Sequence, residues 1–490
     1  MKRPIVCIFG IAEEQKPQFD SGDVMTMLAY PDDNNAKNIV SIMQPDVVVT
    51  VGPSWNKFLN VARNDVHKRW LHVHNIINLK QEAIYFCYIS NLSKNILRMP
   101  KENMPVISCF SPSYNSTGKI NRPFRSLRAQ SYPYWEWIII NDQPHCEKNC
   151  QTLKELEESD ARIRVYNINK NTANIGQHKF ETASLARGKY LVELDHDDDL
   201  TPDCLELVKK AFDQYPDAGF VYTDFCEIFE KDLKPFKYGP VWAFGFGGYY
   251  AQMTKIPGVE GLTLTWVARS ANINNITMAN IVGVPNHIRV WERDLYMDIG
   301  GHHPLAVGDD YELLIRTFLK TRMVRIPYLG YYQYRNQDGN TTFKRMNLIT
   351  MIQSTTYKVY YDRIQTRAKE LGVVQEKYNT GKPAWGQSDE YVEKSANYTY
   401  KSDKGETVVL LTTTGKDVFE TTLQSVLSGN YSEICIVGDC VDYLDEVIEK
   451  YKNDLRLRWW NLHQKMGLKS CKKYAEYNMI RTEKVTFINC

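Results

Sequence analysis

The chain has 490 residues, 43% of them hydrophobic and 24% charged, which is the composition of a folded protein and excludes a disordered one. At about 150 residues per domain, this length predicts roughly three domains. Sixty Lys and Arg residues against 58 Asp and Glu residues leave a formal net charge of +2, which argues against a general nucleic-acid-binding protein. A local basic groove stays compatible with these numbers.

Two further features concern the membrane and the cysteines. No stretch approaches the about 18 uncharged apolar residues of a membrane span, and the apolar run in MKRPIVCIFGIAEEQ is too short for a signal peptide. The 11 cysteines contain no C-x-x-C pair, so we predict reduced thiols and neither a disulfide framework nor a zinc site. The sequence thus favours a cytoplasmic, multidomain protein without a membrane span.

Residues 1–100 alternate short apolar runs with helical stretches, which predicts a small parallel α/β accessory domain. The expected strands are 5–9, 46–51, 70–73 and 84–89. Gly52 and Ser54 follow a strand and are compatible with phosphate binding, but no full glycine-rich fingerprint surrounds them. Three interpretations of residues 1–100 stay open: an accessory role, a second ligand site, or a transferase module of another fold.

Residues 105–199 alternate strands with helices, and each polar cluster in this segment comes just after a strand. The expected strands begin at 106 and cover 137–140, 163–166 and 190–194, and the expected helices cover 122–130, 153–159 and 178–186. Ligands of open α/β sheets bind outside the carboxyl ends of the strands, so we expect these polar clusters to converge.

The same pattern restarts near residue 405, after a polar and partly helical connector at 344–404. SGNYSEICIVGD resembles AQSYPYWEWIIIND, LRLRWWN matches ARIRVYN, and KVTFIN matches KYLVEL, which indicates an internal repeat over 405–490. The repeat stops at Cys490, where the first copy presents Asp195. We expect a second copy that is cut short; a copy that lost its acidic end is the alternative.

The segment LVELDHDDDL places a run of carboxylates directly after an apolar strand. Asp195 and Asp197 share one side of an extended segment, because side chains alternate with period two. Two such carboxylates can bind Mg²⁺ or Mn²⁺ and leave positions for water and a diphosphate. A solvated acidic turn or a helix N-cap is the alternative.

Two strand ends could form a nucleoside pocket. Asp142 ends the strand in IIIND, where its carboxylate suits hydrogen bonds to a uracil or ribose edge, although it could equally cap the next loop. Pro112, Tyr114 and Asn115 follow the first strand and could line the base pocket. The alternative for Tyr114 is an ordinary loop aromatic.

The segment GGHHPLAVGDDYELLIRTF carries two acids at the start of an amphipathic helix. One of Asp309 and Asp310 can cap the helix while the other faces the pocket as a general base for an acceptor hydroxyl. His302 and His303 are candidate metal ligands, but adjacent histidines without further partners are more often polar loop groups.

Residues 235–252 are rich in glycine and aromatic residues. Their aromatic rings could stack on the faces of an acceptor sugar; the candidates are Trp242, Phe244, Phe246 and Tyr249. Core packing of a flexible loop is the alternative.

Residues 105–343 resemble the inverting glycosyltransferases of family two, which have the GT-A fold, an α/β Rossmann-like fold. The resemblance rests on these motifs taken in order: SPSYN, IIIND, NIGQH, ARGKYLVELDHDD, FVYTD, IGG and GDDYELLIR. It implies a nucleotide-sugar donor, UDP-linked, and a carbohydrate acceptor. By this resemblance Pro112, Tyr114 and Asp142 contact the nucleoside, Asp195 and Asp197 the metal and diphosphate, and Asp310 is the base with Asp309 beside it.

Three departures from that family pattern stand out. GQHKFETA replaces the usual Ala-Arg-Asn run after Gly176, so Lys179 is the only nearby cation, and with Arg335 it is a candidate for stabilising the leaving diphosphate. Asn141 stands where an acid often precedes Asp142. Gln337 stands where many members have a metal-binding His, which puts a third protein ligand in doubt.

The leading hypothesis is a metal-dependent glycosyltransferase that uses Mn²⁺ or Mg²⁺. The repeat after residue 405 is compatible with a sugar polymerase or a serial transferase. A nucleotidyltransferase or phosphotransferase would use similar metal–diphosphate chemistry, but it gives no reason for GDDYELLIR. A non-catalytic sugar-binding scaffold derived from a transferase is the other alternative.

Overall fold

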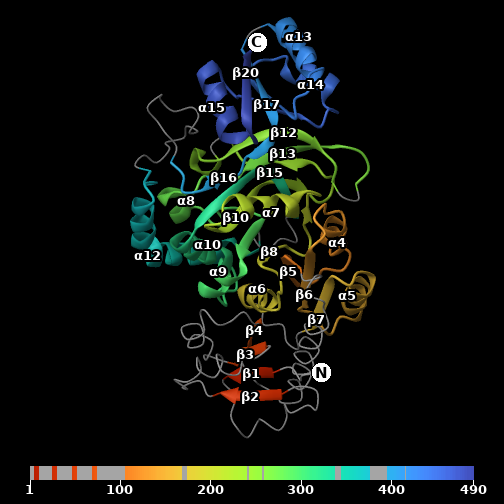
Figure 1. Ribbon diagram of the computed structural model, residues 1–490, viewed down its shortest axis with the longest axis vertical. Coiled ribbons are helices and arrows are strands. Elements are labelled where there is room, and N and C mark those ends of the chain that lie inside the picture. Colours follow the sequence, from red (N-terminus) through yellow and green to blue (C-terminus); the bar gives the residue numbers. More distant parts are fainter. Residues whose placement is uncertain are drawn as a thin grey trace. The chain divides into compact units, whose positions relative to one another are not determined.

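The computed structural model (Figure 1) describes four strands of the first 104 residues and most of residues 105–490. Its gaps after residue 105 are 168–173, 240–241, 257–258, 337–343, 376–393 and 414, together with the side chain of Phe244. The chain forms two compact units: the first is Met1–Asn121, Tyr132–His196 and Val290–Leu313, and the second is Arg122–Ser131, Asp197–Arg289 and Leu314–Cys490. Both units take segments from 105–343, which the sequence predicts as one domain.

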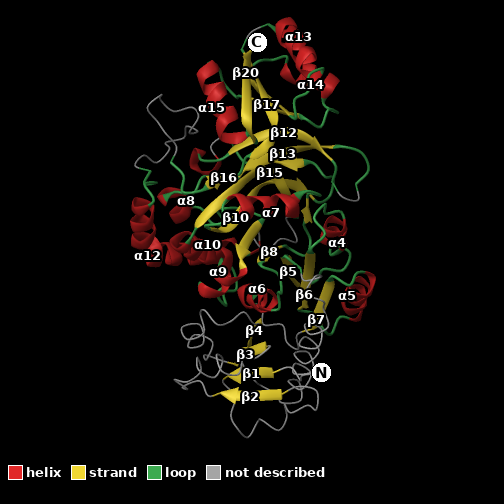
Figure 2. Ribbon diagram, viewed as in Figure 1, coloured by secondary structure: helices red, strands yellow, loops and turns green. Residues whose placement is uncertain are grey.

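The N-terminal region contains a four-stranded parallel sheet in the order β2-β1-β3-β4 (Figure 2). Its strands are β1 (Ile5–Phe9), β2 (Met25–Ala29), β3 (Val47–Val51) and β4 (Arg69–Val73). Three of them confirm the expected strands, whereas 84–89 lies outside the described residues. β2 was not predicted, because MTMLA has only one β-branched residue and otherwise favours a helix.

The first unit also contains a parallel sheet in the order β8-β5-β6-β7, with β14 beside β8. Its strands are β5 (Ile107–Ser113), β6 (Trp135–Asn141), β7 (Ile163–Asn167), β8 (Tyr190–Glu193) and β14 (Arg289–Glu292). Its helices are α5 (Glu147–Ser159), α6 (Ile175–Ser184), α9 (Arg293–Asp298) and the first turn of α10 (Asp309–Lys320). All seven residues of β6 are buried, as expected for a strand covered on both faces.

A buried carboxylate in β6 links several segments of this sheet. Glu136 is 1% exposed, and its Oε1 accepts a hydrogen bond from Ser108 Oγ in β5 (2.7 Å). Its Oε2 accepts from Arg164 Nη2 in β7 and from Arg187 Nε before β8, both at 2.7 Å. A Cβ on Gly188 would lie 2.7 Å from Ser108 Oγ, so only glycine fits there. These contacts explain the Ala-Arg-Gly lead-in to the acidic run.

The second unit is built around the long parallel pair β10 (Ala218–Phe229) and β15 (Arg322–Arg335), and β10 also pairs antiparallel with β13. The other strands before residue 400 are β9 (Asp199–Leu200), β11 (Pro235–Phe236), β12 (Gly248–Thr254), β13 (Thr263–Arg269) and β16 (Tyr398–Thr399). The helices are α4 (Asn121–Arg128), α7 (Cys204–Gln214), η3 (Trp242–Gly245), α8 (Asn275–Asn280), the rest of α10, and α12 (Met346–Glu370). No helix in the described part of the chain is long and apolar enough to cross a membrane.

The C-terminal part of the second unit repeats the strand order seen at β5–β8. Its parallel strands run β20-β17-β18-β19, the same order as β8-β5-β6-β7, so the repeat inferred from sequence is present in the topology. The strands are β17 (Ser402–Thr412), β18 (Glu433–Gly438), β19 (Leu457–Asn461) and β20 (Thr482–Asn489). In Figure 1 one side of this sheet carries α13 (Lys416–Leu427) and α14 (Leu444–Tyr451), and the other carries α15 (Leu468–Asn478).

The strand register corrects one detail of the sequence comparison. Ser108 pairs with Glu136 and with Leu191, while Thr407 pairs with Glu433 and with Val485. This register makes Asn489 the counterpart of Asp195, whereas the letter match placed Cys490 there. The difference arises because residue letters alone do not fix the pairing of β20 with β17.

The cluster of Glu136 with Arg164 and Arg187 also has a counterpart in the C-terminal sheet. Glu433 lies 2.8 Å from Arg458 Nη2 and 3.6 Å from Arg481 Nη1, the counterparts of Arg164 and Arg187. Both copies therefore hold the strands together with one carboxylate between two guanidinium groups.

We expect Glu136→Ala to lower the free energy of unfolding by about 3–5 kcal/mol, because it leaves two buried guanidinium groups without their carboxylate. Urea unfolding followed by circular dichroism measures the loss. The matched control is Glu155→Ala on the exposed face of α5, which should change stability by less than about 0.5 kcal/mol. Equal effects of the two substitutions would contradict a structural role for the cluster.

Candidate active site

The end of β5 offers one exposed aromatic ring. Tyr114 follows the strand and is 53% exposed, while Pro112 is half-buried within it. Asn115 has a φ of 51°, a left-handed conformation that Asn tolerates better than most residues, and its N–H donates to Gln143 Oε1 at 2.8 Å. The loop is therefore fixed by its backbone, and the Tyr114 ring is left accessible.

Asn141, at the end of β6, has a structural reason to be an amide. Its Oδ1 accepts hydrogen bonds from Asn149 Nδ2 (2.8 Å) and from the N–H of Gln143 (2.9 Å). Its Nδ2 donates to Asn167 Oδ1 at 2.7 Å. An ionised carboxylate could not donate that last bond, which accounts for the departure from an acidic pair here.

Asp142 follows Asn141 and is only 7% exposed. Its Oδ1 lies 3.4 Å from His178 Nε2 but has no hydrogen-bond partner among the described residues. Burial raises the pKa of Asp142 to about 6, with His178 opposing the rise and Glu181 adding to it. A buried acceptor oxygen without a partner is costly, so this oxygen suits an N–H or O–H of a bound molecule.

His178 and Glu181 are neighbours of Asp142 that sequence reasoning missed. His178 Nδ1 lies 3.2 Å from Glu181 Oε2, and the two residues are three positions apart on α6. Burial lowers the pKa of His178, but the hydrogen bond and charge of Glu181 and the charge of Asp142 raise it above its usual value overall. The i,i+3 spacing of the two residues in GQHKFETA was the available signal.

Lys179 lies in a buried group of ionisable side chains. Its Nζ donates to Glu193 Oε1 at 2.5 Å and lies 3.7 Å from Asp309 Oδ2. His302 Nε2 is 3.7 Å and 3.8 Å from the same two oxygens, and its Nδ1 is 2.7 Å from Tyr296 Oη. Burial works to lower the pKa of Lys179, but attraction to Glu193 and Asp309, with smaller contributions from Asp195 and Asp310, raises it well above its usual range. Lys179 is therefore charged, and its ammonium group is already paired with buried carboxylates.

Asp309 and Asp310 have different surroundings at the start of α10. Asp309 is buried, and burial raises its pKa while Lys179 and His302 oppose the rise. Asp310 is half-buried, and its Oδ1 accepts a hydrogen bond from the N–H of Tyr311 at 2.8 Å. The N-terminus of a helix favours a carboxylate, so Asp310 is placed where its charged form is stabilised.

Gly176 is required by protein packing. A Cβ at this position would overlap the backbone oxygen of His303 and lie 2.8 Å from Asp309 Cβ. Gly176 N–H donates to Leu305 O at 3.1 Å. Asn174 caps α6 and donates its Nδ2 to Pro304 O at 2.9 Å. The start of α6 thus holds the loop before α10.

Asp195 follows β8 in the first unit and is half-buried; the rest of the acidic run lies in the second unit. Asp198 accepts hydrogen bonds from Tyr331 Oη and from the N–H of Tyr334, both at 2.8 Å, and Asp199 accepts from Tyr334 Oη at 2.7 Å. The half-buried carboxylate of Asp197 makes no hydrogen bond or ion pair with any described residue. Asp198 and Asp199 thus have structural partners, and Asp197 stays open to a ligand.

No metal-binding group of three or more His, Cys, Asp or Glu side chains occurs among the described residues. His303 Nδ1 lies 3.3 Å from Glu312 Oε2, whereas His302 is buried beside Glu193 and Asp309. Gln337 lies outside the described residues.

Two arginines of the second unit are held by neighbouring acids. Arg122 donates to the backbone oxygen of Asp197 (3.0 Å) and to Glu230 (2.7 Å). Arg335 pairs with Glu227, and its guanidinium lies 3.8 Å from the centroid of the Phe236 ring. Arg335 therefore already has a carboxylate and an aromatic partner.

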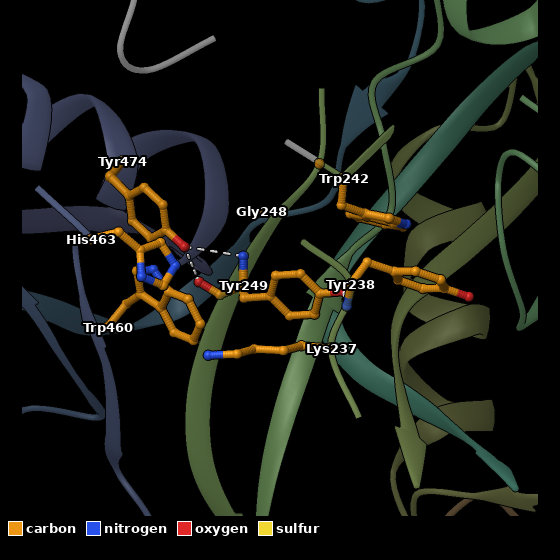
Figure 3. A pocket seen from close by; sticks show the side chains of 9 residues that line it. Lys237, Tyr238, Trp242, Gly248, Tyr249, Trp460, His463 and Tyr474 are labelled. Atoms are coloured by element: carbon orange, nitrogen blue, oxygen red, sulfur yellow. Dashed lines mark hydrogen bonds between the residues drawn. The ribbon is translucent and has the colours of Figure 1, made fainter. Parts of the chain in front are cut away.

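A small aromatic pocket lies within the second unit (Figure 3). Its lining residues are Lys237, Tyr238, Trp242, Gly247, Gly248, Tyr249, Trp460, His463 and Tyr474. Its cavity of about 20 Å³ has room for about one water molecule, far less than a sugar ring.

The rings of this pocket pack mostly against one another. Trp242 stacks on Tyr238 with 5.9 Å between ring centroids, and Trp460 stacks on Tyr474 at 6.4 Å. Tyr249 is buried, and its N–H donates to Tyr474 Oη at 3.0 Å. Phe246 is fully buried, and the Phe244 side chain lies outside the described residues. This arrangement favours the packing alternative for the predicted acceptor residues.

Residues 108–260 contain the parallel strands β6, β7 and β8, all of β5 except its first residue, and the segments that follow these strands. Residues 108–260 match the model described as glycosyl transferase family 2. This part of the chain, called the family 2 domain below, is therefore similar to glycosyl transferase family 2. The family 2 domain has the α/β GT-A fold predicted from the motifs.

The chain is similar to several curated proteins over part of its length. The chain is 36% identical over 140 residues to the uncharacterised protein y4gI of Sinorhizobium fredii, covering 28% of this chain and 15% of that protein. It is 34% identical over 109 residues to the putative teichuronic acid biosynthesis glycosyltransferase TuaG of Bacillus subtilis, covering 21% and 40%. It is 30% identical over 120 residues to the chondroitin synthase of Pasteurella multocida, covering 24% and 12%.

These matches span less than half the length of the relatives concerned. A crystal structure of S. aureus TarS 1–349 in complex with UDP aligns at a TM-score of 0.38 and 12% identity, covering 54% of this chain and 70% of that chain.

The raised pKa values of Asp142 and His178 predict a pH dependence of stability. Between about pH 4 and pH 6 the native state holds a proton on Asp142 that the unfolded chain has lost, so stability falls as the pH rises. Protonated His178 contributes stability at low pH that is lost as the pH rises through its raised pKa.

We therefore expect the free energy of unfolding of the wild type, relative to Asp142→Asn, to fall by about 1–2 kcal/mol between about pH 4 and pH 7, after allowance for partial solvent screening. Urea unfolding at a series of pH values measures this difference. Glu155→Gln on exposed α5 is the control and should run parallel to the wild type. Parallel curves for Asp142→Asn would contradict the assigned titration.

Proposed function

We propose that the chain transfers a sugar from a UDP-linked donor to a hydroxyl group of a carbohydrate acceptor, with inversion and with a divalent cation. The observation that carries this proposal is the buried Oδ1 of Asp142, which has no described hydrogen-bond partner and ends β6 in a family 2 domain. An N–H of a nucleobase or an O–H of ribose would satisfy it. The exposed ring of Tyr114 supplies a surface on which the base can stack.

Asp195 and Asp197 are the residues proposed to hold Mn²⁺ or Mg²⁺. The fit rests on the Asp197 carboxylate, which makes no hydrogen bond or ion pair with any described residue. Residues 196 and 197 form a turn directly after Asp195, so the extended segment expected from the sequence is absent there. Two carboxylates together with diphosphate oxygens are a ligand set that Mg²⁺ commonly takes. The cation would neutralise charge on the diphosphate as it leaves.

Asp310 is the proposed general base. Its carboxylate accepts the proton of the acceptor hydroxyl while the acceptor oxygen bonds to the glycosidic carbon from the face opposite the diphosphate. The bond from that carbon to the diphosphate breaks, and its electron pair leaves with the nucleoside diphosphate. One displacement inverts the carbon and needs no protein nucleophile.

The donor site is tested by calorimetric titration of UDP with and without Mn²⁺. We expect Mn²⁺ to strengthen UDP binding, and Asp195→Ala/Asp197→Ala to weaken it about tenfold or more in the presence of Mn²⁺. Asp213→Ala on the exposed side of α7 is the control. UDP binding that is equally strong with and without Mn²⁺ would contradict the proposed cation. If the wild type binds no UDP, the proposed UDP-linked donor is wrong.

The base is tested by the rate of UDP release from a UDP-sugar, since transferases usually hydrolyse their donor slowly. We expect Asp310→Asn to reduce this rate by about 10²–10⁴-fold, because the proton acceptor is lost, and to leave UDP affinity unchanged. The control is Asp294→Asn on exposed α9. A wild type that releases no UDP from any donor would favour the sugar-binding scaffold.

A further inference from the structure

We propose that Lys179 is a positioning residue for the base Asp310, acting through Asp309, and that it does not bind the donor diphosphate. The inference rests on the proposed function, because it concerns the base named there. It reverses the role that the sequence predicts for Lys179, the only cation in the run after Gly176.

The first argument is where the ammonium group lies. Lys179 is 8% exposed, and its Nζ sits between Glu193 Oε1 at 2.5 Å and Asp309 Oδ2 at 3.7 Å. A buried ammonium group is stable only while carboxylates pair with it, and breaking such a pair is strongly unfavourable. Moving Lys179 onto a diphosphate would leave these two buried carboxylates without their cation.

The second argument is the charge of the cluster. Glu193 and Asp309 are both buried, and His302 Nε2 lies 3.7 Å and 3.8 Å from their oxygens. Without Lys179 the two like charges would repel each other across a buried space. Asp309 could relieve this only by moving or by taking up a proton.

The third argument is mechanical. Gly176 and Lys179 are three residues apart and so lie on one face of α6. Gly176 touches the backbone of His303 with no room for a Cβ, and Lys179 reaches Asp309. This face of α6 therefore contacts the middle of the loop that leads into α10 and the first residue of α10.

The consequence concerns Asp310, the next residue on the first turn of α10. A shift of Asp309 rotates or displaces that turn and moves the Asp310 carboxylate with it. A general base must lie within hydrogen-bond reach of its proton, and a misplacement of about 1 Å can cost about 10² in rate.

The test compares Lys179→Met with Lys179→Arg, which keeps the charge, and with Lys154→Met on exposed α5 as the control. UDP affinity is measured by calorimetry with Mn²⁺. The turnover number and KM for UDP release are measured with whichever of UDP-glucose, UDP-N-acetylglucosamine and UDP-glucuronate the wild type hydrolyses fastest.

For Lys179→Met we expect about a 10²-fold loss of kcat, with UDP affinity and donor KM within about twofold of wild type. Lys179→Arg should recover at least about tenfold of that loss, and Lys154→Met should match the wild type. A tenfold or greater loss of UDP affinity in Lys179→Met would overturn the inference in favour of diphosphate binding. An unchanged kcat would overturn it as well.

If Lys179→Met does not fold, Asp309→Asn provides the second test, since it breaks the same link and leaves Lys179 beside Glu193. Reduced kcat with unchanged UDP affinity supports the inference, and unchanged kcat overturns it. Failure of the proposed function is seen separately, because the wild type would then bind no UDP or release none before any variant is compared.

Discussion

The carboxylate of Glu136 is the contact on which the parallel sheet of the first unit depends. It accepts hydrogen bonds from β5, from β7 and from the segment before β8, and each of these comes from a different part of the sequence. Because a buried carboxylate needs its cations, the three segments cannot separate without a large penalty. The ends of β5, β6 and β8, where the candidate donor residues lie, are located by this arrangement.

The acidic residues near the site differ in role because their surroundings differ. Asp142 is buried with one oxygen lacking a described hydrogen-bond partner, whereas Asp198 and Asp199 are held by tyrosine hydroxyl groups. Asp309 is enclosed with a lysine and a histidine, and its neighbour Asp310 is half-buried. Of two adjacent carboxylates, one can therefore stabilise the fold while the other stays accessible to a ligand.

Much of the fold could be predicted because it follows from local patterns. The apolar runs at β5–β8 and the repeated letters after residue 405 indicated the strands and their recurrence, which the pairing order confirms. Residues of β2 were missed because their side chains carry little strand preference. The register of β20 could not be read either, since pairing depends on contacts with a distant strand.

The candidate site was only partly predictable for a similar reason. The resemblance indicated which acids to consider, but the partners of Asp198 and Asp199 are Tyr331 and Tyr334, more than 130 residues away. The direction of the Lys179 side chain depends on Glu193 and Asp309, which only the folded chain brings to it. A glycine in a motif likewise does not reveal whether it admits a ligand or, as Gly176 does, a protein backbone.

The two copies of the repeated sheet share their structural charges but differ in the partners of one carboxylate. The second copy keeps Glu433 with Arg458 and Arg481, the charges that hold its strands. Asp439, the counterpart of Asp142, instead has its two oxygens occupied by the backbone N–H groups of Met466 and Gly467, at 2.6 Å and 3.0 Å. The second copy thus keeps the charges that hold its strands, while the carboxylate at the Asp142 position holds the backbone at the start of α15.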